Sequence, residues 1–284
     1  MLFQEAALSC LLLLSSASAL APASKVVVFG GTGYVGSRVC ERLVNKGYQV
    51  TGVSRRGQNP QPSNEALEQV NWIAGDATDA AFVQAQVQNQ DAVVHAVGLL
   101  FDVESGLQQF NTIVSGSKSL PDPEKSTYDQ ITRQTMFYII DALEAQAKNP
   151  LNMFNKNTQP TPLAFVSCAE AGWPDVTLGE WVESNVAPAW LQKYLVAKRA
   201  VEARLSNTPC VRPVIVRPSL IWSWDKLDVL PLIPVFDLAN AIGVPFVDKT
   251  VRVETLADAI VAGLEQETVQ GVQRFDSMEQ LAKN

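Results

Sequence analysis

The sequence predicts an α/β protein with a doubly wound parallel sheet and a small C-terminal substrate or cap region. Apolar β-branched runs alternate with amphipathic helical segments from residue 25 to residue 218, and a glycine-rich turn joins the first run to the first helix. Strands that alternate with helices form parallel sheets with right-handed crossovers. The chain has 284 residues, 47% of them hydrophobic, which is enough for one large domain with its own core.

Each strand is justified by its pattern. The run "KVVVFGG" lacks polar alternation, as expected of a strand buried on both faces. The segment "YVGSRVCERLVNKGY" follows it with helical spacing and ends on Lys46 and Gly47, a typical helix C-terminus. We expect strands at 25–31, 49–54, 70–75, 91–98, 162–168 and 212–218, and further helices near 79–89, at 126–146 and at 193–205.

Three segments interrupt this alternation. Residues 101–125 and 148–161 are predicted to be long loops, which in compact domains are usually lids or disordered inserts. Residues 226–247 are strongly apolar but are interrupted by Pro231, Pro234, Asp237 and Pro245. Two interpretations of this segment stay open: ordinary core and cap packing, or a substrate wall or membrane-facing patch. We place the substrate or cap region at 219–250.

The first 24 residues differ from the rest. An apolar run from Ala6 to Leu14 is too short to span a bilayer, and "ASA" at 17–19 is shaped like a signal-peptidase site. We interpret 1–24 as a targeting leader and 25–284 as the folded domain. "ASALAP" resembles the cleavage motif of bipartite plastid leaders, although Leu20 stands where an aromatic residue usually follows the cut. The expected location is a plastid, with the mitochondrion as the alternative. An N-terminus without a targeting role also stays open.

Composition excludes several classes of function. The net charge is −7 and no block of Lys and Arg occurs, so no nucleic-acid partner is expected. The four cysteines are scattered without metal-ligand spacing. His95 is the only histidine, so a multi-histidine metal site is excluded and a Ser-His-Asp hydrolase would depend on it alone. No metal is expected.

A dinucleotide site is predicted at the first strand–helix turn. Gly30, Gly33 and Gly36 have G-x-x-G-x-x-G spacing after a buried strand and before a helix. Glycine allows the backbone to approach a pyrophosphate closely, and the helix N-terminus offers free N–H groups to it. A glycine-rich turn without a ligand is the alternative.

The end of the second strand indicates which cofactor binds. An NAD site usually has an acidic residue there, whereas this chain has Ser54, Arg55 and Arg56. Guanidinium groups favour the 2′-phosphate of NADP. NADP is therefore expected, with NAD and a merely solvated basic turn as alternatives.

These motifs resemble the atypical short-chain dehydrogenase/reductases. "VVVFGGTGYVGSRVCERL", "GD" at 75–76, "YLVAKRAVEARL" and "VIVRPSLIW" carry the resemblance, which runs from about Lys25 to Gly271. The group that the chain most resembles includes the nucleotide-binding accessory subunit of respiratory complex I, a coenzyme Q assembly protein and plant plastid Rossmann proteins. The resemblance implies a Rossmann fold. It further implies that the cofactor is held by the glycines with Thr32, Tyr34 and Val35, by Asp76, by Ala96, Val97 and Gly98, by Lys198, and by Arg217 and Pro218.

The same resemblance places Ser167, Tyr194 and Lys198 at catalytic positions. Tyr194 and Lys198 stand four residues apart on one helix face. A tyrosine exchanges a proton with a substrate oxygen only if its high pKa is lowered, and we expect the lysine ammonium to lower it. Ser167 is expected to hold the substrate oxygen. The chain departs from the family pattern at Thr132, Ser219 and "HAVG" after the fourth strand. A packed but non-catalytic Tyr–Lys pair is the alternative.

The sequence therefore supports two main functions. The first is an NADP(H)-dependent oxidoreductase that acts on an apolar organellar substrate, such as a quinone, an isoprenoid or a lipid-derived carbonyl. The second is a non-catalytic NADPH-binding accessory or assembly subunit of an organellar quinone-related complex, with peripheral membrane or protein-complex association through 226–247. A sensor of the NADPH/NADP ratio is a third reading.

Overall fold

The computed structural model describes residues 20, 23–103, 105–107, 110–111, 126–149, 159–225 and 233–283. Most of the expected leader, and most of both expected long loops, lie outside the described residues. Before the first strand, Leu20 is buried in the core, and the Ala23 N–H donates to the Gly47 carbonyl at 3.1 Å. Packing of the domain therefore begins a few residues ahead of Lys25.

Seven parallel strands form one sheet in the order β3-β2-β1-β4-β5-β6-β9. This confirms the predicted fold class. The strands are β1 (Lys25–Phe29), β2 (Gln49–Ser54), β3 (Asn71–Ala74), β4 (Ala92–His95), β5 (Thr161–Val166), β6 (Val211–Val216) and β9 (Gly271–Gln273). Strand order reverses between β1 and β4, and ligands of such sheets bind outside the carboxyl ends of the strands at this point.

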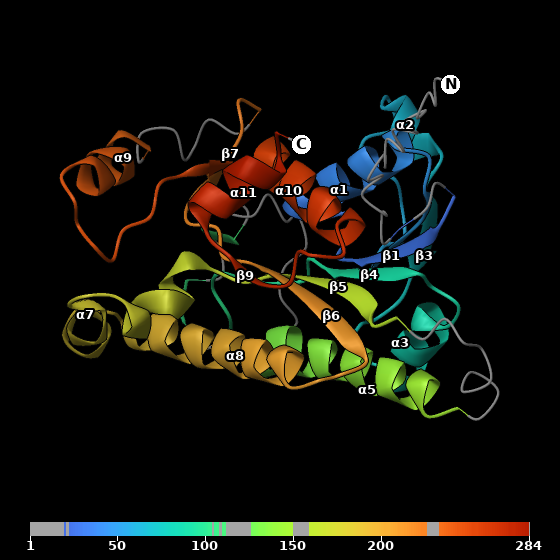
Figure 1. The fold of residues 1–284 in the computed structure, drawn as a ribbon, viewed down its shortest axis with the longest axis horizontal. Helices are drawn as coiled ribbons and strands as arrows, with labels where there is room; N and C mark the ends of the chain where they lie inside the picture. Colours follow the sequence, from blue (N-terminus) through green and yellow to red (C-terminus); the bar gives the residue numbers. More distant parts are fainter. Residues whose placement is uncertain are drawn as a thin grey trace, which may run out of the picture.

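Two layers of helices cover the sheet (Figure 1). On one face lie α1 (Tyr34–Asn45), α10 (Val253–Glu265) and α11 (Phe275–Leu281). On the other face lie α3 (Ala80–Val87), α5 (Thr135–Ala147) and α8 (Ala189–Ser206). Side chains that alternate along the central strands fill a separate apolar core on each face. This double burial explains why the strands are continuous apolar runs rather than alternating ones.

The structure also contains elements that the sequence did not predict. The helix expected at 126–146 begins as a π-helix over Asp129–Gln134 before it continues as α5. The seventh strand β9 has only three residues, too few for a visible pattern. The other additions are also short: α2 (Glu65–Glu68), a 3₁₀ helix (Ala169–Asp175), α7 (Gly179–Asn185), β7 (Ile221–Trp222), α9 (Ile233–Ala241) and β8 (Val251–Arg252).

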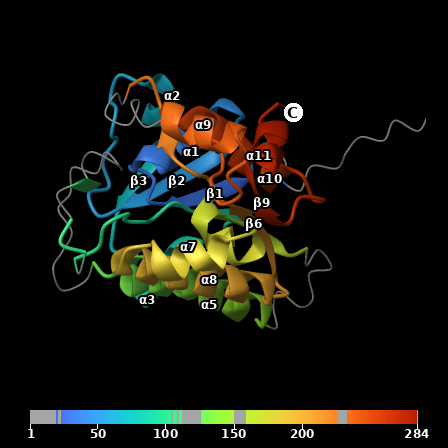
Figure 2. The same cartoon turned by 90° about the vertical axis from the view of Figure 1, so that its left-hand side faces the viewer.

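Two helices, α7 and α9, stand away from the two helix layers. Both lie at the left-hand end of Figure 1, and α9 lies above α7 again in the turned view of Figure 2. The indole of Trp173, just before α7, donates a hydrogen bond to the carbonyl of Phe246, just after α9, at 2.9 Å. The chain segments next to the two helices are therefore joined directly. Among the described residues, no helix has the length and apolarity needed to cross a bilayer.

Candidate active site

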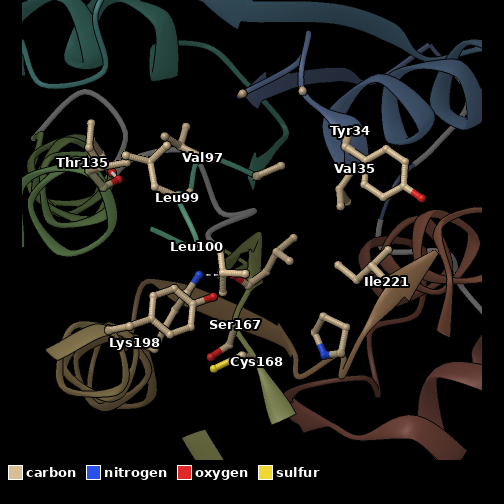
Figure 3. Close-up of a pocket in the computed structure, with 18 of the residues that line it drawn as sticks. Tyr34, Val35, Val97, Leu99, Leu100, Thr135, Ser167, Cys168, Lys198 and Ile221 are labelled. Carbon is tan, nitrogen blue, oxygen red and sulfur yellow. Dashed lines mark hydrogen bonds between the residues drawn. The ribbon is translucent and has the colours of Figure 1, made fainter. Parts of the chain in front are cut away.

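One cavity of about 750 Å³ lies at the carboxyl ends of the central strands. Figure 3 shows Ser167, Cys168 and Lys198 in one part of its lining and Tyr34 and Val35 in another. All the site residues predicted from the sequence line this cavity except Gly36 and Arg217. The structure therefore brings the expected cofactor residues and the expected catalytic residues into one space.

The glycine loop has the close packing that a dinucleotide site needs. Gly30 has a φ of +81°, and a Cβ on it would lie 2.6 Å from the Ala96 carbonyl oxygen. A Cβ on Gly36 would lie 2.2 Å from the Gly30 carbonyl oxygen, so Gly36 allows α1 to pack directly on the loop. Gly36 thus shapes the loop from behind, which explains why it does not line the cavity.

The N-terminus of α1 faces the cavity and suits an anion. The helix begins at Tyr34, its N-cap residue Gly33 offers no side-chain cap, and Thr32, Gly33, Tyr34 and Val35 all line the cavity. The first-turn N–H groups of a helix have no partners inside the helix and carry a partial positive charge. These donors fit the pyrophosphate of a dinucleotide.

The basic residues after β2 stand at the cavity edge. Arg55 and Arg56 line the cavity, are exposed, and form no ion pair with any residue that the structure describes. Ser54, in contrast, has a partner within its own turn: its hydroxyl accepts a hydrogen bond from the Gly57 N–H at 3.0 Å. The two guanidinium groups are therefore the available cations at this end of the cavity.

The loops after β3 and β4 complete the expected nucleotide end. Asp76 lines the cavity and also accepts the Thr78 N–H at 2.9 Å, which fixes the turn before α3. Ala96, Val97 and Gly98 line the cavity after β4. A Cβ on Gly98 would lie 3.9 Å from Lys198 Nζ, so this loop passes close to the lysine.

Lys198 is the buried cation of the site. Only 2% of its surface is exposed, and its ammonium donates a hydrogen bond to the Val166 carbonyl at 2.7 Å. The ammonium also lies 5.3 Å from the centre of the Tyr194 ring and 4.8 Å from that of Phe165. Burial lowers the pKa of Lys198 to about 8. The lysine is therefore mostly charged at neutral pH and close to losing its proton.

Tyr194 differs from the sequence expectation in its pKa. Burial raises the pKa of its hydroxyl well above the ordinary value, and the neighbouring Cys168 and Glu170 raise it further. The expected lowering by Lys198 does not appear, because desolvation of the phenolate is the larger effect. The ring packs edge-on against Tyr128 with 5.4 Å between ring centres. Tyr194 therefore holds its proton at neutral pH and suits the role of a proton donor.

Ser167 lines the cavity, but its hydroxyl is bound elsewhere. It donates to the carboxylate of Glu202 at 2.5 Å, and Glu202 forms a 2.7 Å ion pair with Arg217. Arg217 also reaches Asp175 at 3.4 Å. This explains why Arg217, expected near the nicotinamide, does not line the cavity, whereas its neighbour Pro218 does. The group anchors the ends of β5 and β6 to α8.

Sequence reasoning did not single out Cys168, Glu170 and Glu202. Cys168 and Glu170 line the cavity within electrostatic reach of Tyr194, and burial raises the pKa of both side chains. A signal for Glu202 was present, since Tyr194, Lys198 and Glu202 follow one another at four-residue spacing on one face of α8. Cys168 and Glu170 had no such signal, because only the 3₁₀ turn after β5 brings them to the cavity.

The buried polar groups behind the site include Thr132 and His95. Thr132 is fully buried in the π-helix, and His95 is fully buried at the end of β4 with its Nε2 atom 2.8 Å from the Thr135 hydroxyl. Burial lowers the pKa of His95 to about 3, so this ring is neutral. His95 does not line the cavity. A hydrolase triad built on His95 is therefore excluded.

The remaining walls of the cavity are largely apolar. They come from four separate parts of the chain: the loop after β4, α7, the start of α8 and the region 219–250. Their apolar members are Leu99, Leu100, Val182, Trp190, Leu191, Leu220, Ile221, Phe236, Phe246 and Val247. The cavity thus combines the groups expected of a dinucleotide site with a large apolar wall.

Residues 26–116 match a family model described as the NAD dependent epimerase/dehydratase family. The matched segment runs from β1 past β4 and includes the glycine loop. The Bordetella bronchiseptica enzyme WbmF in complex with NAD+ has the same fold, with a TM-score of 0.55 over 92% of this chain and 77% of that one at 17% identity. At this identity the likeness concerns the fold alone.

Two curated relatives extend the comparison. MIOREX complex component 2 of Saccharomyces cerevisiae is 28% identical over 217 residues, which are 70% of this chain and 73% of that protein. An uncharacterised chloroplastic protein of Arabidopsis thaliana is 42% identical over 71 residues, 22% of this chain and 24% of its own. The similarity to the first relative therefore extends well beyond the nucleotide-binding part.

Proposed function

We propose that this protein is an NADPH-dependent reductase of an apolar carbonyl compound, such as a quinone, an isoprenoid or a lipid-derived carbonyl. One observation carries the proposal: the glycine loop, the Tyr194–Lys198 pair and a large apolar wall line a single cavity. These are the surroundings that a dinucleotide, a reacting carbonyl and an apolar substrate body need.

The protonation states favour reduction over oxidation. A bound reduced nicotinamide supplies a hydride. The hydroxyl of Tyr194 donates a proton to the carbonyl oxygen, so that the C=O group becomes an alcohol, and solvent then restores the proton. Tyr194 suits this direction because its raised pKa keeps the hydroxyl protonated at neutral pH. Lys198, mostly charged at pH 7, stabilises the negative charge that develops on the two oxygens.

NADPH is the proposed donor because of the charges at the cavity edge. Arg55 and Arg56 line the cavity without an ion-pair partner among the described residues, and each offers several N–H donors to a phosphate. The strand before them ends at Ser54, whose hydroxyl is engaged by Gly57. The described segment 53–57 at this strand end contains no acidic residue that could hold the ribose hydroxyls of NAD.

An organelle is the proposed location. The chloroplastic relative supports a plastid, in line with the signal-like leader, and the mitochondrion is the alternative.

A second function has its own support. The relative over 70% of this chain is named a component of a complex, and this favours a non-catalytic NADPH-binding accessory or assembly subunit. Both functions require the cofactor, and only the first requires Tyr194 for turnover.

The test is cofactor oxidation against a panel of quinones and long-chain aldehydes, with NADPH and NADH each titrated by fluorescence. Reduction of at least one panel member, lost in Tyr194→Phe while NADPH still binds, supports the reductase. NADPH binding with no turnover of any panel member favours the accessory subunit. Absence of binding by either cofactor contradicts both.

A further inference from the structure

Helices α7 and α9 expose large apolar side chains. The exposed fraction is 62% for Val235, 64% for Leu238 and 73% for Ile242, and the stretch around α7 exposes Leu178 (60%), Trp181 (58%) and Val186 (61%). None of the residues in α9 is buried. We call these six residues the apolar rim: Leu178, Trp181, Val186, Val235, Leu238 and Ile242.

The apolar rim lies on and beside two helices that each contribute to the lining of the cavity. Val182 of α7 and Phe236 of α9 line the cavity, each from the same helix as rim residues that face solvent. Figures 1 and 2 place the two helices at the same end of the molecule. The exposed apolar surface is therefore continuous with the apolar walls of the cavity.

Helix α9 and the residues just after it carry almost no charge, whereas the charged residues of α7 are acidic. Residues 233–247 contain no Lys or Arg, and their one acid, Asp237, accepts hydrogen bonds from the N–H and hydroxyl of Thr250. Helix α7 has no basic residue, and its Glu183 is paired with Arg199. The whole chain carries a charge of −7. Anionic headgroups would therefore be repelled, and an uncharged apolar surface matches the rim.

We propose that the apolar rim docks the protein on the surface of a membrane whose headgroups carry no net charge. The rim side chains would enter the interface between headgroups and acyl chains, where tryptophan is favoured. The passage of substrate from the bilayer into the cavity rests on the proposed function, whereas the docking itself does not. A bilayer fits this surface because all six rim side chains are apolar and exposed, and because neither α7 nor α9 contains a basic residue.

The test is flotation of the full-length protein with phosphatidylcholine vesicles. The wild type should float with the vesicles, at low and high salt alike, and adding phosphatidylglycerol should not strengthen binding. The double variant Leu238→Glu/Ile242→Glu should lose about tenfold or more of its vesicle affinity, because two charges must leave water. Val272→Glu on β9 is the control, since Val272 is also exposed (40%) but lies outside the rim. It should bind as the wild type does.

A second measurement detects whether the rim itself enters the bilayer, so binding through residues 1–24 does not affect its result. Brominated phosphatidylcholine quenches tryptophan that enters the bilayer, and the Trp181→Phe variant isolates the contribution of Trp181. Quenching that disappears in this variant supports the proposal. Unquenched Trp181, or equal flotation of the rim and control variants, overturns it.

Self-association in the ultracentrifuge that is lost in the rim variant would assign the rim to a second copy and overturn it too. Vesicle binding with no turnover of any carbonyl would leave docking standing and reject only the reductase.

Discussion

The hydroxyl of Ser167 donates a hydrogen bond to the carboxylate of Glu202 across 2.5 Å, and Glu202 is in turn paired with Arg217. Glu202 is only 6% exposed. The group joins β5, α8 and the end of β6 directly beneath the cavity. It gives Ser167 a structural partner in addition to its place in the cavity lining.

Removing the cation of this group should destabilise the fold strongly. In Arg217→Met the carboxylate of Glu202 is left buried without its ion-pair partner, and we expect a loss of about 3–5 kcal/mol in the free energy of unfolding. Denaturant unfolding measures this. The control is Arg133→Met, which breaks an exposed ion pair with Asp129 on one helix and should cost about 0.5 kcal/mol or less. Equal losses in the two variants would contradict the role given to the buried group.

The variant Ser167→Ala separates two roles of the Ser167 hydroxyl: support of Glu202 and binding of the substrate oxygen. If the hydroxyl mainly supports Glu202, the variant loses about 1–3 kcal/mol of stability and turnover falls only slightly. If Ser167 instead holds the substrate oxygen, as the sequence predicts, turnover falls by about tenfold or more with an unchanged melting temperature. Paired unfolding and steady-state measurements decide between these outcomes. On the observed geometry we expect the stability loss.

Lys198 should cost the protein stability at neutral pH. Folding lowers the pKa of Lys198 from an ordinary value of 10.5 to about 8. Between pH 8 and pH 10.5 the unfolded state therefore binds more protons than the folded state does. The unfolding free energy therefore rises as pH increases from about 8 to about 10.5. Lys198→Met should raise the stability at pH 7 by roughly 2–3 kcal/mol, and this gain should fade toward pH 10.5. The measurement is denaturant unfolding across this pH range.

An exposed lysine provides the control for that experiment. Lys148→Met removes an exposed ion pair with Glu144 and should leave stability nearly unchanged at every pH. A Lys198→Met variant that is less stable than the wild type at pH 7 would mean that the lysine is a net stabilising contact. That outcome would contradict the prediction that burial of the Lys198 ammonium costs stability.

The cofactor preference should depend on Arg55 and Arg56. NADPH should bind about tenfold or more tightly than NADH, a difference of about 1.4 kcal/mol, which one charge-assisted contact supplies. Arg55→Ala should remove most of this preference without weakening NADH, because NADH has no 2′-phosphate. Fluorescence titration of both cofactors measures it. Equal affinities in the wild-type protein would contradict the NADP assignment.

Much of the fold was predictable because the central strands are buried on both faces. Their apolar runs marked β1, β4, β5 and β6, whereas β2 and the edge strand β3 are only partly buried and have weaker patterns. The glycine loop was found from its spacing between a buried strand and a helix, whereas the Tyr194–Lys198 pair was found from the resemblance to the short-chain dehydrogenase/reductases. Short elements such as β9 and α7 were missed because seven residues or fewer carry no readable period.

The electrostatics of the site could not be predicted from spacing. A lysine one turn from a tyrosine suggested a lowered tyrosine pKa, but the depth of burial decides the direction and the sequence does not contain it. The sequence also did not reveal the hydrogen-bond partner of Ser167, because Glu202 lies on a different element and only the fold brings the two residues together. The apolar segment 226–247 left core and cap packing open beside a substrate wall or membrane-facing patch. In its described part, α9 contains no buried residue and contributes Phe236 to the cavity lining.

The central claim is that Tyr194 donates a proton during reduction by NADPH. Tyr194→Phe keeps the ring and removes only the hydroxyl, so single-turnover oxidation of bound NADPH with the best panel substrate tests the claim most directly. We predict a rate lower by about two to four orders of magnitude, with NADPH affinity nearly unchanged in a parallel fluorescence titration. A Phe variant that oxidises NADPH at the wild-type rate would contradict the claim.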